Sequence, residues 1–173
     1  MPALGFSIAT STLVGQNYGA SKFNRLKEIS KKSQTISFIV LLFFSVVSYI
    51  FAKQVTLIFI QDNINTIQLS TQFIRIISLS FGIIGLMMTL NGIYRGVGET
   101  KIPMVLTLFS LWVLRIPVAY FLSKEIGVLG VWLSFPISDT LTLILSYYIY
   151  NKLKNSNYSL EFKLPVFNLN QDK

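Results

Sequence analysis

Three ionisable side chains, Arg75, Arg115 and Asp139, lie within long apolar stretches of this sequence. A charge near the middle of a bilayer costs about 2.5–3.5 kcal/mol by insertion scales, so such residues usually face a bundle interior, pair with one another and mark a path for solutes or ions. Counted at about 1.5 Å per helical residue, Arg115 lies about 12 Å and Asp139 about 16 Å from the same membrane face. Arg75 has a similar depth, and we predict that the three side chains can meet at one level.

Two roles fit such a cluster. It can be a buried ion pair that only fixes helix packing. Alternatively, it can be a carboxylate that binds a proton or cation and is positioned by the arginines. The sequence contains no Cys and no His. Asp139 is the only acidic residue deep in an apolar stretch, so any proton relay there would have to use its carboxylate. Both roles stay open.

The third apolar stretch carries a row of polar residues and glycines that repeats every three or four positions. Its members are Gln68, Gln72, Arg75, Ser78, Gly82, Gly85, Thr89 and Gly92. That spacing places them on one face of a helix. We predict that this face looks into protein or into a cavity.

Gln16 and Asn91 are neutral polar residues near the ends of the first and third apolar stretches. Helix capping and interhelical hydrogen bonds explain both, and lining of a solute path is the second interpretation. The candidate pathway residues are therefore Asp139, Arg115, Arg75, Gln72, Gln16 and Asn91.

The elements that must position these side chains are apolar helices. The chain is 52% hydrophobic and 13% charged, against roughly 25% charged residues in a soluble domain. A bilayer core needs about 20 helical residues to be crossed. The five apolar segments lie at about 1–20, 34–60, 67–91, 104–123 and 128–150. We predict an all-α integral membrane domain over 1–150 with five transmembrane helices.

Charge outside these segments predicts their orientation. Lys and Arg gather in the linker 21–33, in the loop after the third segment and in the tail 151–173. Cytoplasmic loops of membrane proteins carry the excess of such residues. We therefore predict a basic cytoplasmic linker, either a short surface helix or a solvated segment, a polar cytoplasmic tail and an extracytoplasmic N-terminus. The net charge of +8 is assigned to orientation, not to nucleic acid, since no basic stripe with interleaved aromatics is present.

The sequence gives little support for an enzyme activity. Without Cys or His, disulfides and His-based metal sites are excluded, and no nucleophile–base pair is visible. Gly96 and Gly98 begin a segment, 96–101, that superficially resembles a nucleotide loop. It lacks the third glycine of the dinucleotide motif and the Gly-Lys-Ser/Thr of the phosphate loop, so we predict a tight structural turn. No enzyme activity, metal or cofactor is expected.

Three stretches in register resemble the C-terminal half of the multidrug and toxic compound extrusion (MATE) transporters. They are 9–20, which closes in Gly15-Gln16-Asn17-Tyr18-Gly19-Ala20; 91–103, which contains Arg95-Gly96-Val97-Gly98-Glu99-Thr100-Lys101; and 112–132, which begins Trp112-Val113-Leu114-Arg115-Ile116-Pro117. The resemblance implies a fold of twelve helices in two six-helix lobes, of which this chain matches helices eight to twelve. A repeat of this kind places the solute path between the lobes.

By the same resemblance, the parent protein exports organic, often cationic solutes in exchange for H+ or Na+ across a prokaryotic plasma membrane. A first-lobe polypeptide is then needed, and we expect no transport by this chain alone. The branch that extrudes norfloxacin has a carboxylate in the tenth helix, where this chain has Arg75, which favours the other bacterial and archaeal branch. Two alternatives remain: a lipid-linked saccharide flippase, whose basic cavity would use Arg75 and Arg115, and a non-transporting membrane scaffold or partner half.

Overall fold

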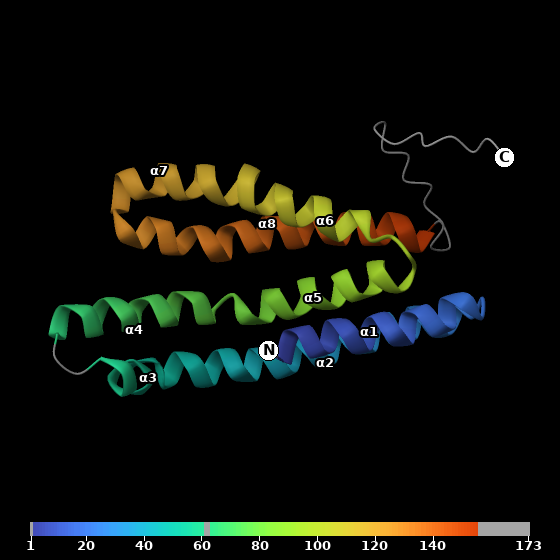
Figure 1. Ribbon diagram of the computed structural model, residues 1–173, viewed down its shortest axis with the longest axis horizontal. Helices are drawn as coiled ribbons and strands as arrows, with labels where there is room; N and C mark the ends of the chain where they lie inside the picture. The colour runs from blue at the N-terminus through green and yellow to red at the C-terminus, as the bar shows by residue number, and fades with distance from the viewer. Residues whose placement is uncertain (1, 61–62, 156–173) are drawn as a thin grey trace.

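The computed structural model describes residues 2–60 and 63–155, and every element in these ranges is helical (Figure 1). The elements are α1 (Pro2–Gly19), α2 (Phe23–Ile50), α3 (Ala52–Phe59), α4 (Ile64–Ser78), α5 (Phe81–Gly96), α6 (Lys101–Leu108), the π-helix η1 (Phe109–Arg115), α7 (Ile116–Ile126) and α8 (Val128–Asn155). They run side by side along the long axis of the molecule (Figure 1). The predicted all-α fold is confirmed for the described residues.

Helix α5 is the centre of the bundle and packs on α1, α2 and α8. Two of its glycines allow α1 to approach closely: a side chain at Gly92 would collide with the backbone of Ser7, and one at Gly96 with Val14. Contacts between small residues are a common way to hold helices together in a bilayer. The buried apolar core lies beside this contact and consists of Val14, Leu26, Leu90, Ile93, Tyr94, Val97, Ile102, Leu106, Tyr150 and Leu153.

The predicted third span, 67–91, consists of two helices instead of one. Helices α4 and α5 meet at an angle of 45° across Leu79 and Ser80. Ser45 of α2 donates a hydrogen bond of 2.6 Å to the carbonyl oxygen of Ser78. Carbonyls at a helix end lack intrahelical partners, so this contact satisfies one of them at the break.

The basic segment 21–33 is not a separate linker or surface helix. From Phe23 onward it is the first part of α2, which continues without interruption to Ile50. Lys, Arg, Glu and Gln are good helix formers, so their charge alone does not end a helix. The predicted second span, 34–60, is in turn interrupted at Phe51, between α2 and α3.

Helices α6, η1 and α7 form one continuous rod that folds back on α8 (Figure 1). The reversal occurs at Gly127, whose φ of 63° lies in the left-handed region that favours glycine. Gly130 then lies so close to the backbone of Leu122 that a larger residue would collide with it. The fifth predicted span, 128–150, extends to Asn155 in α8, and the rest of the predicted tail, 156–173, lies outside the described residues.

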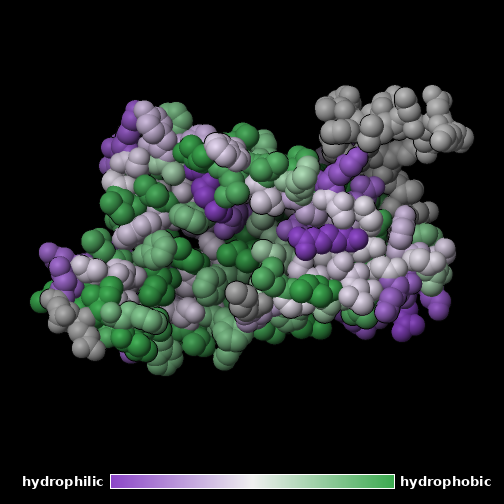
Figure 2. Space-filling model, viewed as in Figure 1, coloured by the Kyte–Doolittle hydropathy of each residue, from purple (hydrophilic) through white to green (hydrophobic). Residues whose placement is uncertain are grey.

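Three segments in the described ranges are long and apolar enough to cross a membrane: Phe23–Ile50, Lys101–Ile126 and Val128–Asn155. The bent α4–α5 pair makes a fourth if it counts as one span. The first predicted span is the 18-residue helix α1, which is not among them because hydroxyl and amide residues dilute its apolar sequence. Figure 2 shows hydrophobic side chains over much of the bundle, with hydrophilic ones toward both ends and a further group near the middle of this face.

Candidate functional site

Arg115 and Asp139 form an ion pair between η1 and α8. A terminal guanidinium nitrogen of Arg115 lies 2.6 Å from Oδ1 of Asp139. The side chain of Asp139 is 9% exposed and that of Arg115 is 24% exposed. Two of the three charges predicted to meet therefore do so, inside segments apolar enough to cross a membrane.

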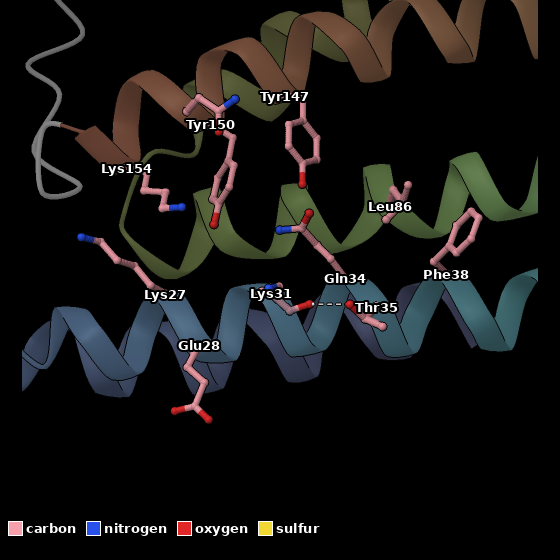
Figure 3. A pocket seen from close by; sticks show the side chains of 11 residues that line it. Lys27, Glu28, Lys31, Gln34, Thr35, Phe38, Leu86, Tyr147, Tyr150 and Lys154 are labelled. Carbon is pink, nitrogen blue, oxygen red and sulfur yellow. Dashed lines mark hydrogen bonds between the residues drawn. The ribbon is translucent and has the colours of Figure 1, made fainter.

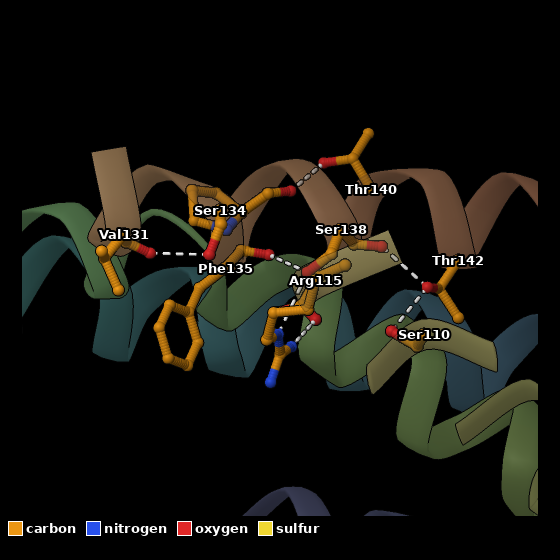
Figure 4. A network of polar contacts seen from close by, with 10 residues as sticks. Ser110, Arg115, Val131, Ser134, Phe135, Ser138, Thr140 and Thr142 are labelled. Carbon is orange, nitrogen blue, oxygen red and sulfur yellow. Dashed lines mark hydrogen bonds and ion pairs between the residues drawn. The ribbon is translucent and has the colours of Figure 1, made fainter. Parts of the chain in front are cut away.

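A network of hydroxyl groups surrounds this pair along the inner face of α8 (Figure 4). Nε of Arg115 donates to Oγ of Ser138 at 3.1 Å, and Ser138 in turn donates to the carbonyl oxygen of Phe135. The guanidinium also lies over the Phe135 ring, 4.6 Å from its centroid, a favourable cation–π distance. The hydroxyl of Thr142 lies 2.8 Å from that of Ser110 in η1. These contacts fix the position of Arg115.

The π-helix η1 is the local feature that brings Ser110 and Arg115 to the same neighbour. In a π-helix the hydrogen bonds join residues five apart, so residues with this separation lie close to one face of the helix. Pro117 is the second residue after η1. It has no N–H, and its ring clashes with the carbonyl four residues earlier in a regular α-helix. A widened turn before Pro117 relieves this clash, and π-turns of this kind occur often at functional sites.

The inner face of α8 carries small hydroxyl residues four positions apart. Ser134, Ser138, Thr142 and Ser146 are all buried. Sequence reasoning missed Ser110, since its alignment with Arg115 depends on the π-helix. It also missed Tyr94 of α5, whose hydroxyl donates to the carbonyl oxygen of Ser146 at 2.5 Å. Tyr94 lies past the end of the predicted third segment, 67–91, where the helix was not expected to continue.

Arg75 does not join the pair. Its guanidinium carbon lies 5.5 Å from the ring centroid of Tyr49 in α2, and among the described residues it has no carboxylate partner. The predicted polar row also divides at the break between α4 and α5. Its members from Ser78 to Gly92 are buried, whereas Gln68, Gln72 and Arg75 are exposed on this chain. The 45° bend breaks the single helical face on which the prediction rested.

Gln16 and Asn91 lie apart from the ion pair as well. Gln16 is exposed and lines a pocket of about 500 Å3 beside Lys22 and Arg25. Asn91 is half-buried in α5. The structure therefore brings together Arg115 and Asp139 from the candidate set and leaves Arg75, Gln72, Gln16 and Asn91 outside this contact.

The two glycines assigned to a turn have different positions. Gly98 lies in the turn with a φ of 88°, which favours glycine. Gly96 is the last residue of α5 and not part of the turn, a correction to the expectation. Its lack of a side chain serves the contact with Val14 of α1.

The second carboxylate oxygen of Asp139 is the chemically available group of the site. Within 2–60 and 63–155, Arg115 contacts Oδ1, and Oδ2 accepts no hydrogen bond. A carboxylate in this state can bind a proton, a cation or a cationic group of a solute, at the cost of weakening its pair with Arg115. The same described residues contain no group of three or more His, Cys, Asp or Glu side chains that could hold a metal ion.

Three known proteins with similar sequences are named for multidrug resistance or extrusion. The chain is 28% identical to "Probable multidrug resistance protein YoeA" of Bacillus subtilis over 87% of its length. It is 31% identical to "Probable multidrug resistance protein NorM" of Thermotoga maritima over 88% of its length, and 31% identical to mouse "Multidrug and toxin extrusion protein 1" over 79%. It spans 33%, 33% and 24% of those three proteins.

Solved structures share the fold. An inward-facing multidrug resistance MATE family transporter matches 90% of this chain with a TM-score of 0.85 and 21% identity. The Vibrio cholerae MATE transporter VcmN matches the same share with a TM-score of 0.82 and 15% identity. The chain covers 36% and 35% of these two structures.

A family-level comparison agrees with both results. The family model described as MatE matches residues 1–121, which include α1 to η1 and the first part of α7. The chain belongs to the MatE family, the multidrug and toxic compound extrusion transporters.

Proposed function

We propose that this chain forms the C-terminal lobe of a two-lobe antiporter that exports organic, often cationic solutes in exchange for H+ or Na+. The observation that carries the proposal is the Arg115–Asp139 pair, a charged group within the membrane segments of a MatE-family chain. Intramembrane charges that face a bundle interior commonly belong to solute or ion paths. The transporter-like names of the relatives support transport as the function instead of catalysis.

In this proposal, the free oxygen of Asp139 receives the coupling ion or the cationic solute. Binding there weakens the contact with Arg115, and the guanidinium keeps its contacts to Ser138 and Phe135. Because Arg115 belongs to a π-helix next to Pro117, a change in this pair can move α7 relative to α8. Such a shift is the kind of local event that biases rocking of one lobe against another.

A first-lobe polypeptide is the partner that the proposal requires. The chain spans about a third of the bacterial relatives, and a path between two lobes cannot be enclosed by one. We therefore test efflux of a cationic dye from cells that express this chain alone, a candidate first lobe alone, or both. We expect efflux only when both are present. Efflux by this chain alone would contradict the two-lobe requirement. An absence of efflux with every matching first lobe would leave the scaffold alternative.

The flippase alternative required a basic cavity that contains Arg75 and Arg115. In the structure the first lies over Tyr49 and the second is paired with Asp139. Neither arrangement favours two free cations in one cavity, and no other observation favours that activity.

We further propose that the protein lies in a prokaryotic plasma membrane with its basic end in the cytoplasm. The helix reversals bring the start of α2, the turn after α5 and the end of α8 to the same end of the molecule (Figure 1). The bacterial relatives support the cellular context, and the positive-inside tendency supports the orientation.

A further inference from the structure

A pocket of about 740 Å3 lies at the basic end of the molecule, away from the Arg115–Asp139 pair. Helices α2 and α8 form its two walls. Both pack on α5 but scarcely on each other, so a groove stays open between them above α5. Figure 3 shows side chains from all three helices around this space.

The pocket is positively charged. Lys27 and Lys31 of α2 and Lys154 of α8 line it, and in the described ranges none of the three has a carboxylate partner. Glu28 also belongs to the lining. Its carboxylate is paired with Lys32 at 2.6 Å and points away from α8 (Figure 3). Among the described residues, three lysines therefore line this space, and the one carboxylate in its lining has another partner.

The lining changes from charged to apolar along the helices. The lysines lie toward the end of the bundle, and Phe38 and Leu86 line the inner part. From Lys27 to Phe38 the pocket extends about 16 Å along α2 at a rise of about 1.5 Å per residue. Between these zones, the hydroxyl groups of Tyr147 and Tyr150 point from α8 across to the amide of Gln34 (Figure 3). Such a gradient matches an amphiphile with an anionic head and an apolar tail.

We propose that this pocket binds the headgroup of an anionic phospholipid from the membrane leaflet at the basic end. The phosphate lies among the three lysines, with tyrosine hydroxyls as further donors, and an acyl chain follows Phe38 and Leu86. Basic pockets between transmembrane helices bind anionic headgroups in this way, and tyrosine commonly lies at headgroup level. A soluble phosphate shares the head chemistry but makes no use of the apolar zone. The site does not depend on the proposed transport function.

The test is native mass spectrometry of the chain in detergent, titrated with phosphatidylglycerol or phosphatidylcholine. The pocket variant is Lys27→Gln/Lys31→Gln/Lys154→Gln. The control is Lys53→Gln/Lys101→Gln/Lys152→Gln, which removes the same charge at exposed positions outside the pocket lining. We expect saturable binding of phosphatidylglycerol, weak binding of phosphatidylcholine, and a loss of about tenfold or more in the pocket variant alone. Equal effects of the two triple variants would overturn the proposal.

A second variant and a competitor separate the remaining explanations. Gln34→Glu keeps every lysine and adds a negative charge inside the pocket, so we expect it to weaken phosphatidylglycerol binding as well. Unchanged binding in this variant would contradict the location of the headgroup. Glycerol 3-phosphate is then added as a soluble competitor. Failure to displace the lipid supports the lipid assignment, whereas displacement at equal concentration would show that the pocket recognises a soluble anion instead.

Discussion

At the scale of single residues, the pair of Arg115 and Asp139 is the feature that the sequence anticipated best. Depth along a helix follows from residue counting, so the two charges could be placed at similar levels. Counting does not determine which way a side chain points around the helix axis once the helix is bent. Arg75 has a comparable depth but lies over Tyr49, because α4 is bent away from the line of α5.

Removing one partner of this pair should be costly. Arg115→Leu leaves the carboxylate of Asp139 without its cation, and we expect a loss of about 3 kcal/mol in the free energy of unfolding. The double variant Arg115→Gln/Asp139→Asn removes both charges together, so no buried charge is left without its partner, and we expect a smaller loss than in Arg115→Leu although Gln is shorter than Arg. Both are measured by unfolding in mixed detergent micelles. Equal losses in the two variants would show that charge pairing does not stabilise this site.

At the scale of elements, the sequence predicted helices well and their interruptions poorly. The charged start of α2 marks a change in environment and not a helix end. The break at Leu79–Ser80 and the π-helix η1 follow no simple local pattern. The first contains neither proline nor glycine, and the second is recognisable only through Pro117 and its contacts with α8.

The π-helix makes a testable contact between η1 and α8. The chain has no cysteine, so Ser110→Cys/Thr142→Cys introduces a single pair where two hydroxyl groups lie 2.8 Å apart. We expect a disulfide to form on mild oxidation, detected as a mobility shift that a reductant reverses. Ser110→Cys/Thr140→Cys is the matched control, since Thr140 is exposed on α8. Cross-linking of the control as efficiently as the test pair would contradict the observed register.

The close contact between α1 and α5 should make the protein sensitive to an added side chain at Gly96. A methyl group at Gly96 would lie 2.7 Å from Val14 and 2.8 Å from the carbonyl oxygen of Ser11. We therefore expect Gly96→Ala to lower the free energy of unfolding by about 1–3 kcal/mol, the usual cost of overpacking. Gly5→Ala, where a methyl group meets nothing within 4 Å, should be neutral or slightly stabilising. The comparison is made by denaturant titration in micelles, and a stable Gly96→Ala variant would argue against close packing of α1.

At the scale of the whole molecule, the proposed orientation in a bilayer rests on the apolar helices and the basic end. We expect Lys152→Cys, at the end of α8, to react with a membrane-impermeant maleimide only in opened cells. Lys124→Cys, near the opposite end, should react in intact cells. Labelling in the reverse pattern would overturn the proposed orientation. The family and the fold could be predicted from three sequence stretches. The surroundings of Arg75 and Gln72 could not, because they depend on the 45° bend between α4 and α5.

The central claim is that the Arg115–Asp139 pair takes part in ion-coupled transport and does not serve packing alone. The most direct measurement is dye efflux from cells that contain this chain with its first lobe, compared among Asp139→Asn, Arg115→Gln/Asp139→Asn and the unmodified chain at equal expression. We expect both variants to lose efflux, because neither retains the carboxylate. Efflux restored in the double variant to the unmodified level would contradict the claim and leave the pair a packing contact.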